Sequence, residues 1–175
     1  MIADEQECNV KGSLRANLAF WEENLKPSSF VLNVVMHGYV LPLIRVPPIF
    51  YAKNNMSAVK HAEFVSEAIE SLLQKGLLEE LPGPAHCSNP LTVADKGKLR
   101  LVLDLRHVNA FIRVKKFRYE DLKIVAELFE DNDYFVTFDI TSGYHHIDIH
   151  PDHHKYLGCH WNFKGGKKGI FNSPF

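Results

Sequence analysis

Residues 134–149 constrain the fold of this chain more than any other stretch. They open with an apolar run of aromatic and β-branched residues and reach a single carboxylate at Asp139. They continue through Thr-Ser-Gly into a second apolar alternation at Ile147 and Ile149. Aromatic and β-branched residues favour a buried strand. A strand that ends in Asp139 would hold a carboxylate where the backbone leaves the core, which suits a metal ligand. Because aspartate also favours turns, a purely structural role stays open.

Composition limits the classes of protein to consider. The chain has 175 residues, of which 46% are hydrophobic, enough for one ordinary core. Its net charge of -1 gives no overall basic field that would indicate a nucleic-acid partner. Basic residues do gather locally, and each cluster is either a solvated loop or a phosphate-contacting surface. The clusters are Arg113, Lys115, Lys116 and Arg118, and Lys164, Lys167 and Lys168.

Cysteine usage and hydropathy point to an intracellular protein. Cys8, Cys87 and Cys159 are odd in number and far apart, which argues against a disulfide framework and suits a reducing compartment. The N-terminus has no leader pattern, and no apolar run approaches the roughly 18 residues that span a bilayer. We expect a soluble cytoplasmic or nuclear protein without a membrane partner, of undetermined oligomeric state.

Periodicity predicts several elements. The clearest helix covers residues 57–75, whose apolar residues recur three and four apart, with Ser57 as a possible start cap and Gly76 at its end. Two strands, 89–94 and 99–104, would form a hairpin through the turn at residues 95–98. Further helices are predicted over 14–25, from residue 30 to near 38, and over 119–129. A short strand or a turn is predicted near 77–81, and a strand over 156–163 is followed by an exposed hairpin at 164–168.

Two segments resemble motifs of one family. Residues 138–147, Phe-Asp-Ile-Thr-Ser-Gly-Tyr-His-His-Ile, resemble the first catalytic motif of retroelement reverse transcriptases, an Asp with an aromatic residue five positions later. Residues 98–109 resemble the fingers motif of the same family: an Arg, a short apolar run, Asp-x-Arg and then Asn. The motifs stand in the family's order and spacing. The resemblance extends over residues 64–175 and is to the retrotransposon type, DIRS-like or gypsy-like.

The resemblance implies a fold and its division. It implies an α+β fold, the fingers and truncated palm of a right-hand polymerase, with an antiparallel sheet and packed helices. Residues 1–56 would be a lead-in with a helix and an extended Pro-rich segment. Residues 57–133 would be a fingers-like subdomain, and residues 134–175 the truncated beginning of the palm.

The same resemblance implies nucleotidyl transfer with two divalent ions, Mg²⁺ or Mn²⁺ in the complete enzyme. The partners would be an RNA or DNA template–primer and deoxynucleotides. Asp139 would bridge both ions, with the backbone carbonyl of Ile140 as a further ligand. Tyr144 would pack under the sugar and exclude a ribose 2′-hydroxyl. Arg100 would contact the phosphates of the incoming nucleotide.

Other basic residues would complete the binding surface. Lys96 is the nearest substitute for the family's hairpin lysine, because Ala94 and Asp95 occupy that place here. Asp104 and Arg106 are two apart and would pair, which would orient Arg106 toward the template backbone. Residues 111–117 form a basic connector, in which Lys115 and Lys116 would contact nucleic acid.

One departure from the family bears on activity. Its other two catalytic carboxylates lie in an aromatic-x-Asp-Asp hairpin, and no such pair occurs between Asp139 and Phe175. We therefore expect a reverse transcriptase fragment that is inactive alone, and whether it acts as an enzyme stays open. The alternative is a non-catalytic nucleic-acid-binding or interaction remnant of the polymerase fold.

A histidine-rich stretch offers a further alternative, a small zinc module. The spacing is not that of a standard finger, and only one cysteine is present. The residues concerned are His145, His146, His150, His153, His154, Cys159 and His160.

Overall fold

A computed structural model of the chain describes residues 11–116, 121–127, 130, 132–134, 136, 139–140 and 143–174. Its helices are α1 (Ser13–Ala16), α2 (Leu18–Phe20), the π-turn η1 (Trp21–Leu25), α3 (Ser29–His37), α4 (Met56–Lys60), α5 (Ala62–Gln74), α6 (Arg106–Asn109), α7 (Leu122–Glu127) and the 3₁₀ turns η2 (Gly143–His146) and η3 (Pro151–Tyr156). Its strands are β1 (Phe50–Tyr51), β2 (Glu79–Glu80), β3 (Cys87–Ser88), β4 (Leu91–Asp95), β5 (Leu99–Leu103), β6 (Gly158–Asn162) and β7 (Lys168–Asn172).

The predicted central helix forms and is divided at His61 into α4 and α5. Its apolar face is buried, with Val65 and Ile69 fully inaccessible. Gly76, at φ +65°, lies just beyond its end, as predicted. The prediction that Ser57 caps the start is wrong, because the helix begins one residue earlier. The Ser57 hydroxyl instead accepts a hydrogen bond from the N–H of Val93 at 3.1 Å, which joins α4 to β4.

The predicted hairpin of β4 and β5 also forms, in the register Leu91↔Leu103 and Val93↔Leu101. Alternation divides it into two faces. Leu91 and Val93 are buried against α5, and the leucines of β5 pack on the same cluster. Arg100 and Val102 are exposed on the other face.

A second sheet has the strand order β1-β3-β6-β7-β2. The predicted strand at 156–163 forms as β6, and the exposed hairpin joins it to antiparallel β7. The predicted short strand near residue 79 forms as β2 and pairs with β7. The parallel pairs β1–β3 and β3–β6 were not predicted, because two-residue strands carry no periodic signal.

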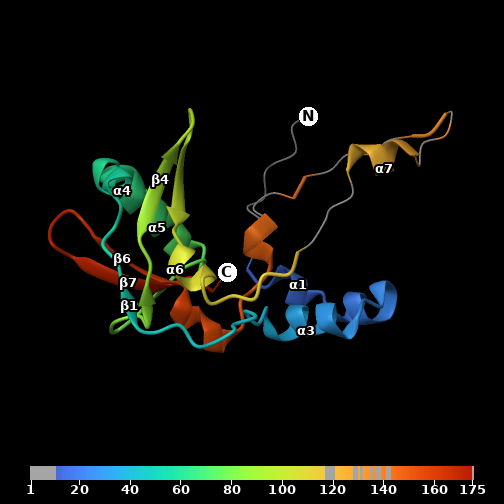
Figure 1. Cartoon of the computed structure of the whole chain (residues 1–175), viewed down its shortest axis with the longest axis horizontal. Coiled ribbons are helices and arrows are strands. Elements are labelled where there is room, and N and C mark those ends of the chain that lie inside the picture. Colours follow the sequence, from blue (N-terminus) through green and yellow to red (C-terminus); the bar gives the residue numbers. More distant parts are fainter. Residues whose placement is uncertain are drawn as a thin grey trace.

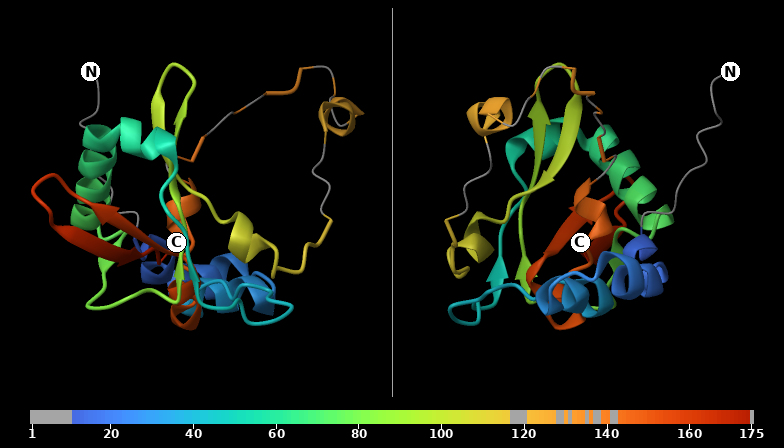
Figure 2. Two further views of the ribbon diagram at one scale, coloured as in Figure 1. Left: turned by 60° about the vertical axis from the view of Figure 1, so that its left-hand side comes forward. Right: turned by 90° about the vertical axis from the view of Figure 1, so that its right-hand side faces the viewer.

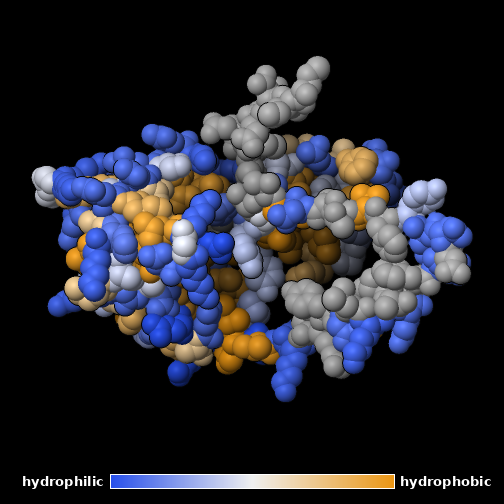
Figure 3. All heavy atoms as spheres, turned by 90° about the horizontal axis from the view of Figure 1, so that it is seen from above, coloured by the Kyte–Doolittle hydropathy of each residue, from blue (hydrophilic) through white to orange (hydrophobic). Residues whose placement is uncertain are grey.

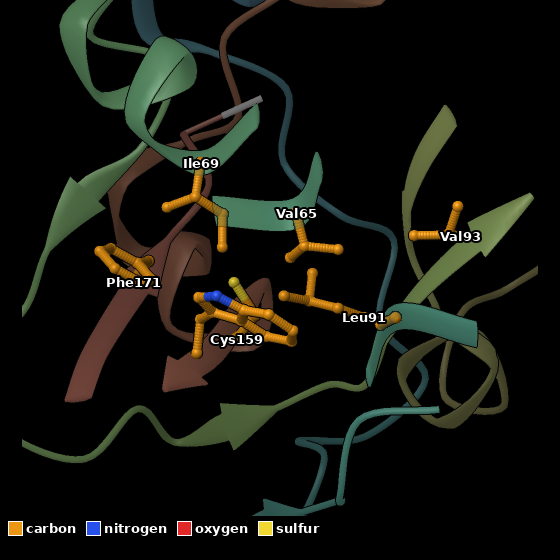
Figure 4. Packing of buried hydrophobic residues seen from close by; sticks show 8 residues of the cluster. Val65, Ile69, Leu91, Val93, Cys159 and Phe171 are labelled. Atoms are coloured by element: carbon orange, nitrogen blue, oxygen red, sulfur yellow. The ribbon is translucent and has the colours of Figure 1, made fainter. Parts of the chain in front are cut away.

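The main core lies between α5, the β4–β5 hairpin and the β6–β7 hairpin (Figure 2). Figure 4 shows Val65 and Ile69 of α5 pointing toward Leu91, Cys159 and Phe171. Burying these apolar side chains supplies the main driving force for joining the two sheets, at about 25 cal/mol per Å². A smaller cluster of Cys87, Val108 and Tyr156 connects β3, α6 and η3.

The N-terminal portion packs at the other end of the molecule (Figure 1). The helix predicted over 14–25 forms as three short pieces, α1, α2 and η1. The helix predicted to end near Gly38 forms as α3, and Ser28 caps it by accepting the N–H of Val31 at 3.4 Å. Within the range predicted as a helix at 119–129, α7 forms at residues 122–127 and lies away from both sheets (Figures 1 and 2).

The prediction that a buried strand carries Asp139 is wrong for the residues that the structure describes. Tyr134 is 99% exposed, Val136 86% and Ile140 62%. Neither sheet includes a strand from the described residues of this stretch. A strand needs a hydrogen-bonded neighbour and a surface to pack on, and an apolar sequence alone supplies neither. Phe138 lies outside the described residues.

Candidate functional site

The segment that resembles the first catalytic motif has its key described side chains at the surface. Asp139 is exposed, and Tyr144, in η2, is 94% exposed. Among the described residues, no three His, Cys, Asp or Glu side chains come together as a metal-ligand group. Asp139 and Ile140 are therefore not accompanied by other ligands, and the side chains that the structure places do not form a site for two divalent ions.

The fingers motif and the first catalytic motif meet at one groove. This open groove of about 430 Å³ lies between α5 and β5, and its lining residues are mostly apolar, with leucine the commonest. Arg100 borders it from β5, although its side chain is exposed on the opposite face of the strand from the leucines, and His145 lines it from the turn that carries Tyr144. Burial lowers the pKa of His145, and the neighbouring His146 and Lys75 lower it further. Viewed from above, apolar side chains are visible in a hollow of the molecule, while hydrophilic residues cover most of the outside (Figure 3).

Lys96 lies at the exposed tip of the β4–β5 hairpin. The tip is closed by Asp95, whose side chain accepts the N–H of Gly97 at 3.3 Å. Gly97 has φ +83°, a conformation that few residues other than glycine adopt. The turn therefore holds Asp95 in a structural role and leaves Lys96 free to face solvent or an anion.

Asp104 and Arg106 form the predicted ion pair, although they do not lie on a strand as expected. β5 ends before them, and Arg106 is the first residue of α6. The Arg106 Nε donates to both oxygens of Asp104, at 2.9 and 3.0 Å. These hydrogen bonds lower the pKa of Asp104. The guanidinium of Arg106 pairs with Asp104 through both Nε and Nη2, while most of the side chain stays exposed to solvent.

The basic connector is anchored by the segment around Pro42 and Arg45, which was not predicted from the sequence. Arg113, Lys115 and Lys116 are exposed. The Arg113 N–H donates to the Pro42 carbonyl at 2.8 Å, and the Arg45 guanidinium lies 5.0 Å from the centre of the Phe111 ring. The chain thus places Arg45 beside the connector by tertiary pairing. No local pattern around Arg45 could have indicated this.

The second basic cluster is occupied by partners. Lys164 pairs with Glu63, Lys167 lies 3.9 Å from Glu80, and Lys168 lies 5.6 Å from the centre of the Tyr51 ring. These contacts favour the solvated-loop interpretation of residues 164–168. Arg118 lies outside the described residues.

The histidine-rich stretch makes hydrogen bonds rather than a metal-ligand group. His160 Nδ1 lies 2.8 Å from the Ser88 hydroxyl, and His153 Nδ1 accepts the N–H of Leu41 at 2.9 Å. Cys159 is buried, and burial raises the pKa of its thiol to about 12. Among the described residues these side chains do not come together as a metal-ligand group, so the geometry gives no support to the zinc module.

The α+β arrangement, with its two antiparallel hairpins packed on α5, has the fold of a reverse transcriptase. The structure is similar to the selenomethionine-labelled CSH mutant of prototype foamy virus protease-reverse transcriptase, with a TM-score of 0.55 and 22% identity, covering 78% of this chain and 18% of that chain. It is also similar to a foamy viral protease-reverse transcriptase in complex with dsDNA, with a TM-score of 0.53 and 19% identity, covering 79% and 29% of the two chains.

Relatives in sequence are retroelement polyproteins. The chain is 25% identical over 141 residues to a putative enzymatic polyprotein of Cassava vein mosaic virus, covering 73% of this chain and 21% of that protein. It is 26% identical over 107 residues to a retrovirus-related Pol polyprotein from transposon 412 of Drosophila melanogaster, covering 57% and 8%. The chain thus spans less than a quarter of either polyprotein. No protein-family model matches the chain. These similarities confirm the resemblance to retroelement reverse transcriptases.

No helix among the residues with a described placement is long and apolar enough to cross a membrane.

Proposed function

We propose that this chain is the fingers and beginning of the palm of a retroelement reverse transcriptase, and that it contacts a template–primer. The observation that carries the proposal is that strand β5 of the fingers-like hairpin and His145, beside Tyr144, border one groove. The division is the one expected from the sequence, with a lead-in to residue 56, fingers at residues 57–133 and palm from residue 134.

The nucleic-acid surface is assigned to the exposed cations at the base of the hairpin. It consists of Arg45, Arg106, Arg113, Lys115 and Lys116, called here the basic surface. Arg106 is exposed although its guanidinium is paired with Asp104. Arg113, Lys115 and Lys116 are exposed, and the Arg113 N–H is bonded to the Pro42 carbonyl. Such cations bind phosphates and release condensed counterions, so the affinity falls steeply with salt.

In the complete polymerase, Asp139 and the Ile140 carbonyl would supply ligands for Mg²⁺ or Mn²⁺. The ions would activate the primer 3′-oxygen and neutralise the triphosphate. Arg100 and Lys96 would hold the phosphates of the incoming deoxynucleotide, and Tyr144 would select the sugar. We expect no primer extension by the present chain alone, because in the part of the chain that the structure describes Asp139 is not accompanied by the carboxylates that such ions need.

The test is binding of a labelled RNA–DNA primer–template, measured by fluorescence anisotropy across a series of salt concentrations. Replacing Arg113, Lys115 and Lys116 with Gln is expected to weaken binding and to reduce the salt slope by about 1 for each phosphate that is no longer neutralised. The matched control replaces Lys164 and Lys167 with Gln, which removes cations already paired with Glu63 and Glu80. Equal losses of affinity in both variants would contradict the assigned surface.

A non-catalytic interaction remnant is the second candidate. It is favoured by the exposure of Asp139, Tyr144 and Ile140, which leaves the first motif unassembled here. The same titration separates the two candidates, because an interaction remnant would show no salt-dependent binding to the primer–template.

A further inference from the structure

Residues 38–44, called here the strap, join two segments that are distant in the sequence. At one end the Tyr39 N–H donates to the Asp148 carbonyl at 2.7 Å, and the His150 N–H donates to the Tyr39 carbonyl at 3.0 Å. At the other end the Ile44 N–H donates to the Phe111 carbonyl at 2.8 Å. Bridges at Tyr39↔Ile149 and Leu43↔Ile112 complete the attachment. The strap therefore links residues 148–150, which follow the first motif, to the basic connector.

The middle of the strap is held by a side chain. The Leu41 N–H donates to His153 Nδ1 at 2.9 Å. A backbone N–H can only donate, so this nitrogen must be the unprotonated one of a neutral imidazole. Protonation would place a second N–H against the first, which removes the bond and leaves two donors facing each other. The contact is therefore compatible with only one charge state of His153.

We propose that His153 is a proton-sensitive latch that holds the strap in place at neutral pH and releases it when its imidazole is protonated. The chemistry follows from the donor and acceptor roles at the contact, and it does not depend on the proposed polymerase function. Its consequence is regulatory. Release of the strap would loosen the Pro42–Arg113 and Ile44–Phe111 hydrogen bonds that anchor the basic connector.

The surroundings of His153 favour the neutral form near pH 7. Burial lowers the pKa of His153, and His150 and Lys155 lower it further, while Asp152 opposes them. From outside this turn, Arg15 of α1 neutralises Asp148, which lies beneath the strap, with a separation of 3.3 Å. The titratable and charged groups around the contact are Arg15, Tyr39, Asp148, His150, Asp152, His154, Lys155 and Tyr156.

The experiment is hydrogen exchange of the whole chain followed by mass spectrometry, from about pH 7.5 to about pH 5, with rates corrected for the intrinsic pH dependence of exchange. We expect protection of the strap amides to fall by up to tenfold per pH unit below the pKa of His153. Peptides from α5 report global unfolding and should keep their protection over the range in which the strap loses its own.

Two variants separate the latch from general acid effects. His153→Asn keeps an acceptor oxygen near the position of Nδ1 but does not titrate, so its strap should stay protected across the range. His150→Asn removes the neighbouring titratable ring without touching the Leu41 contact, so its strap should still be released on acidification. An equal loss of protection in H153N and in the unmodified chain would overturn the proposal.

A second measurement needs no variant. In the unmodified chain, the ¹⁵N shift of His153 Nδ1 should be that of an unprotonated nitrogen at neutral pH. The amide proton of Leu41 should shift with the same midpoint as His153 on acidification. A protonated Nδ1 at neutral pH, or a Leu41 amide that does not follow His153, would overturn the proposal even if H153N failed to fold.

Discussion

Gly38 packs directly against the backbone of Ile149. A Cβ on Gly38 would lie 2.8 Å from both the carbonyl carbon and the carbonyl oxygen of Ile149. Gly38 also has φ +87° and ψ 163°, a region of backbone space that is essentially restricted to glycine. This position therefore requires glycine for two independent reasons, and it is where the N-terminal helices join the strap.

Gly38→Ala should lower the free energy of unfolding more than backbone strain alone explains. The matched control is Gly97→Ala, because Gly97 has φ +83° but open space where a Cβ would be placed. We expect the Gly38 variant to lose at least about 1 kcal/mol more than the control, because only it adds a contact with fixed backbone. Urea unfolding of both variants measures the difference, and equal losses would show that the close approach costs nothing.

Ile69→Ala should destabilise the chain by about 2–5 kcal/mol, since it removes a fully buried side chain from the core between the two sheets. Ile49, which is 81% exposed, provides the control. Ile49→Ala should change the stability by less than about 0.5 kcal/mol. The check is urea denaturation followed by circular dichroism. A small effect at Ile69 would mean that the core does not hold the two sheets together.

The stability should fall as the pH drops below about 6.5, the ordinary pKa of histidine. Burial lowers the pKa of His145, His153 and His160 in the folded chain. Below that pH the unfolded chain binds more protons than the folded chain, so acid favours unfolding until the folded-state pKa values are passed. The free energy of unfolding at about pH 7.5 should exceed that at about pH 5.5. A free energy of unfolding that stays constant across this interval would contradict the lowered pKa values of these histidines.

Arg106→Gln should raise the pKa of Asp104 toward its ordinary value. The side-chain hydrogen bond from Arg106 is the largest cause of the lowered pKa, so removing the guanidinium removes most of the effect. Titration of the Asp104 carboxyl carbon by NMR measures the change directly. Glu63, whose pKa is lowered by Lys164, is an internal reference that should not move. An unchanged pKa of Asp104 would mean that the ion pair is not populated in solution.

Cys87 and Cys159 should not react with a thiol reagent in the folded chain. Both are buried, and burial raises the pKa of each thiol, so little thiolate is present or accessible. In a Cys8→Ser background, their modification should be slow in buffer and fast in urea. Rapid modification under native conditions would show that the cluster around Cys159 opens without global unfolding.

Residues with strong local patterns were placed correctly from the sequence. The apolar stripe of α5 and the alternation of β4 and β5 each describe one face that must be buried, so the element follows from its own residues. The Asp104–Arg106 pair was also predicted, because its members are near neighbours in the chain. Arg45 and the strap were not placed, because their partners at Phe111 and Ile149 lie far along the chain and no periodicity marks such contacts.

The sequence by itself determined the family resemblance, the two hairpins and the central helix, since these depend on residues close to one another in the chain. Only the tertiary structure decided what surrounds Asp139 and Tyr144. An apolar run becomes a buried strand when a neighbouring strand pairs with it, and in the described residues the stretch at 134–140 has no such neighbour. Local composition fixes which surfaces need to be buried, while pairing between distant segments decides which of them are.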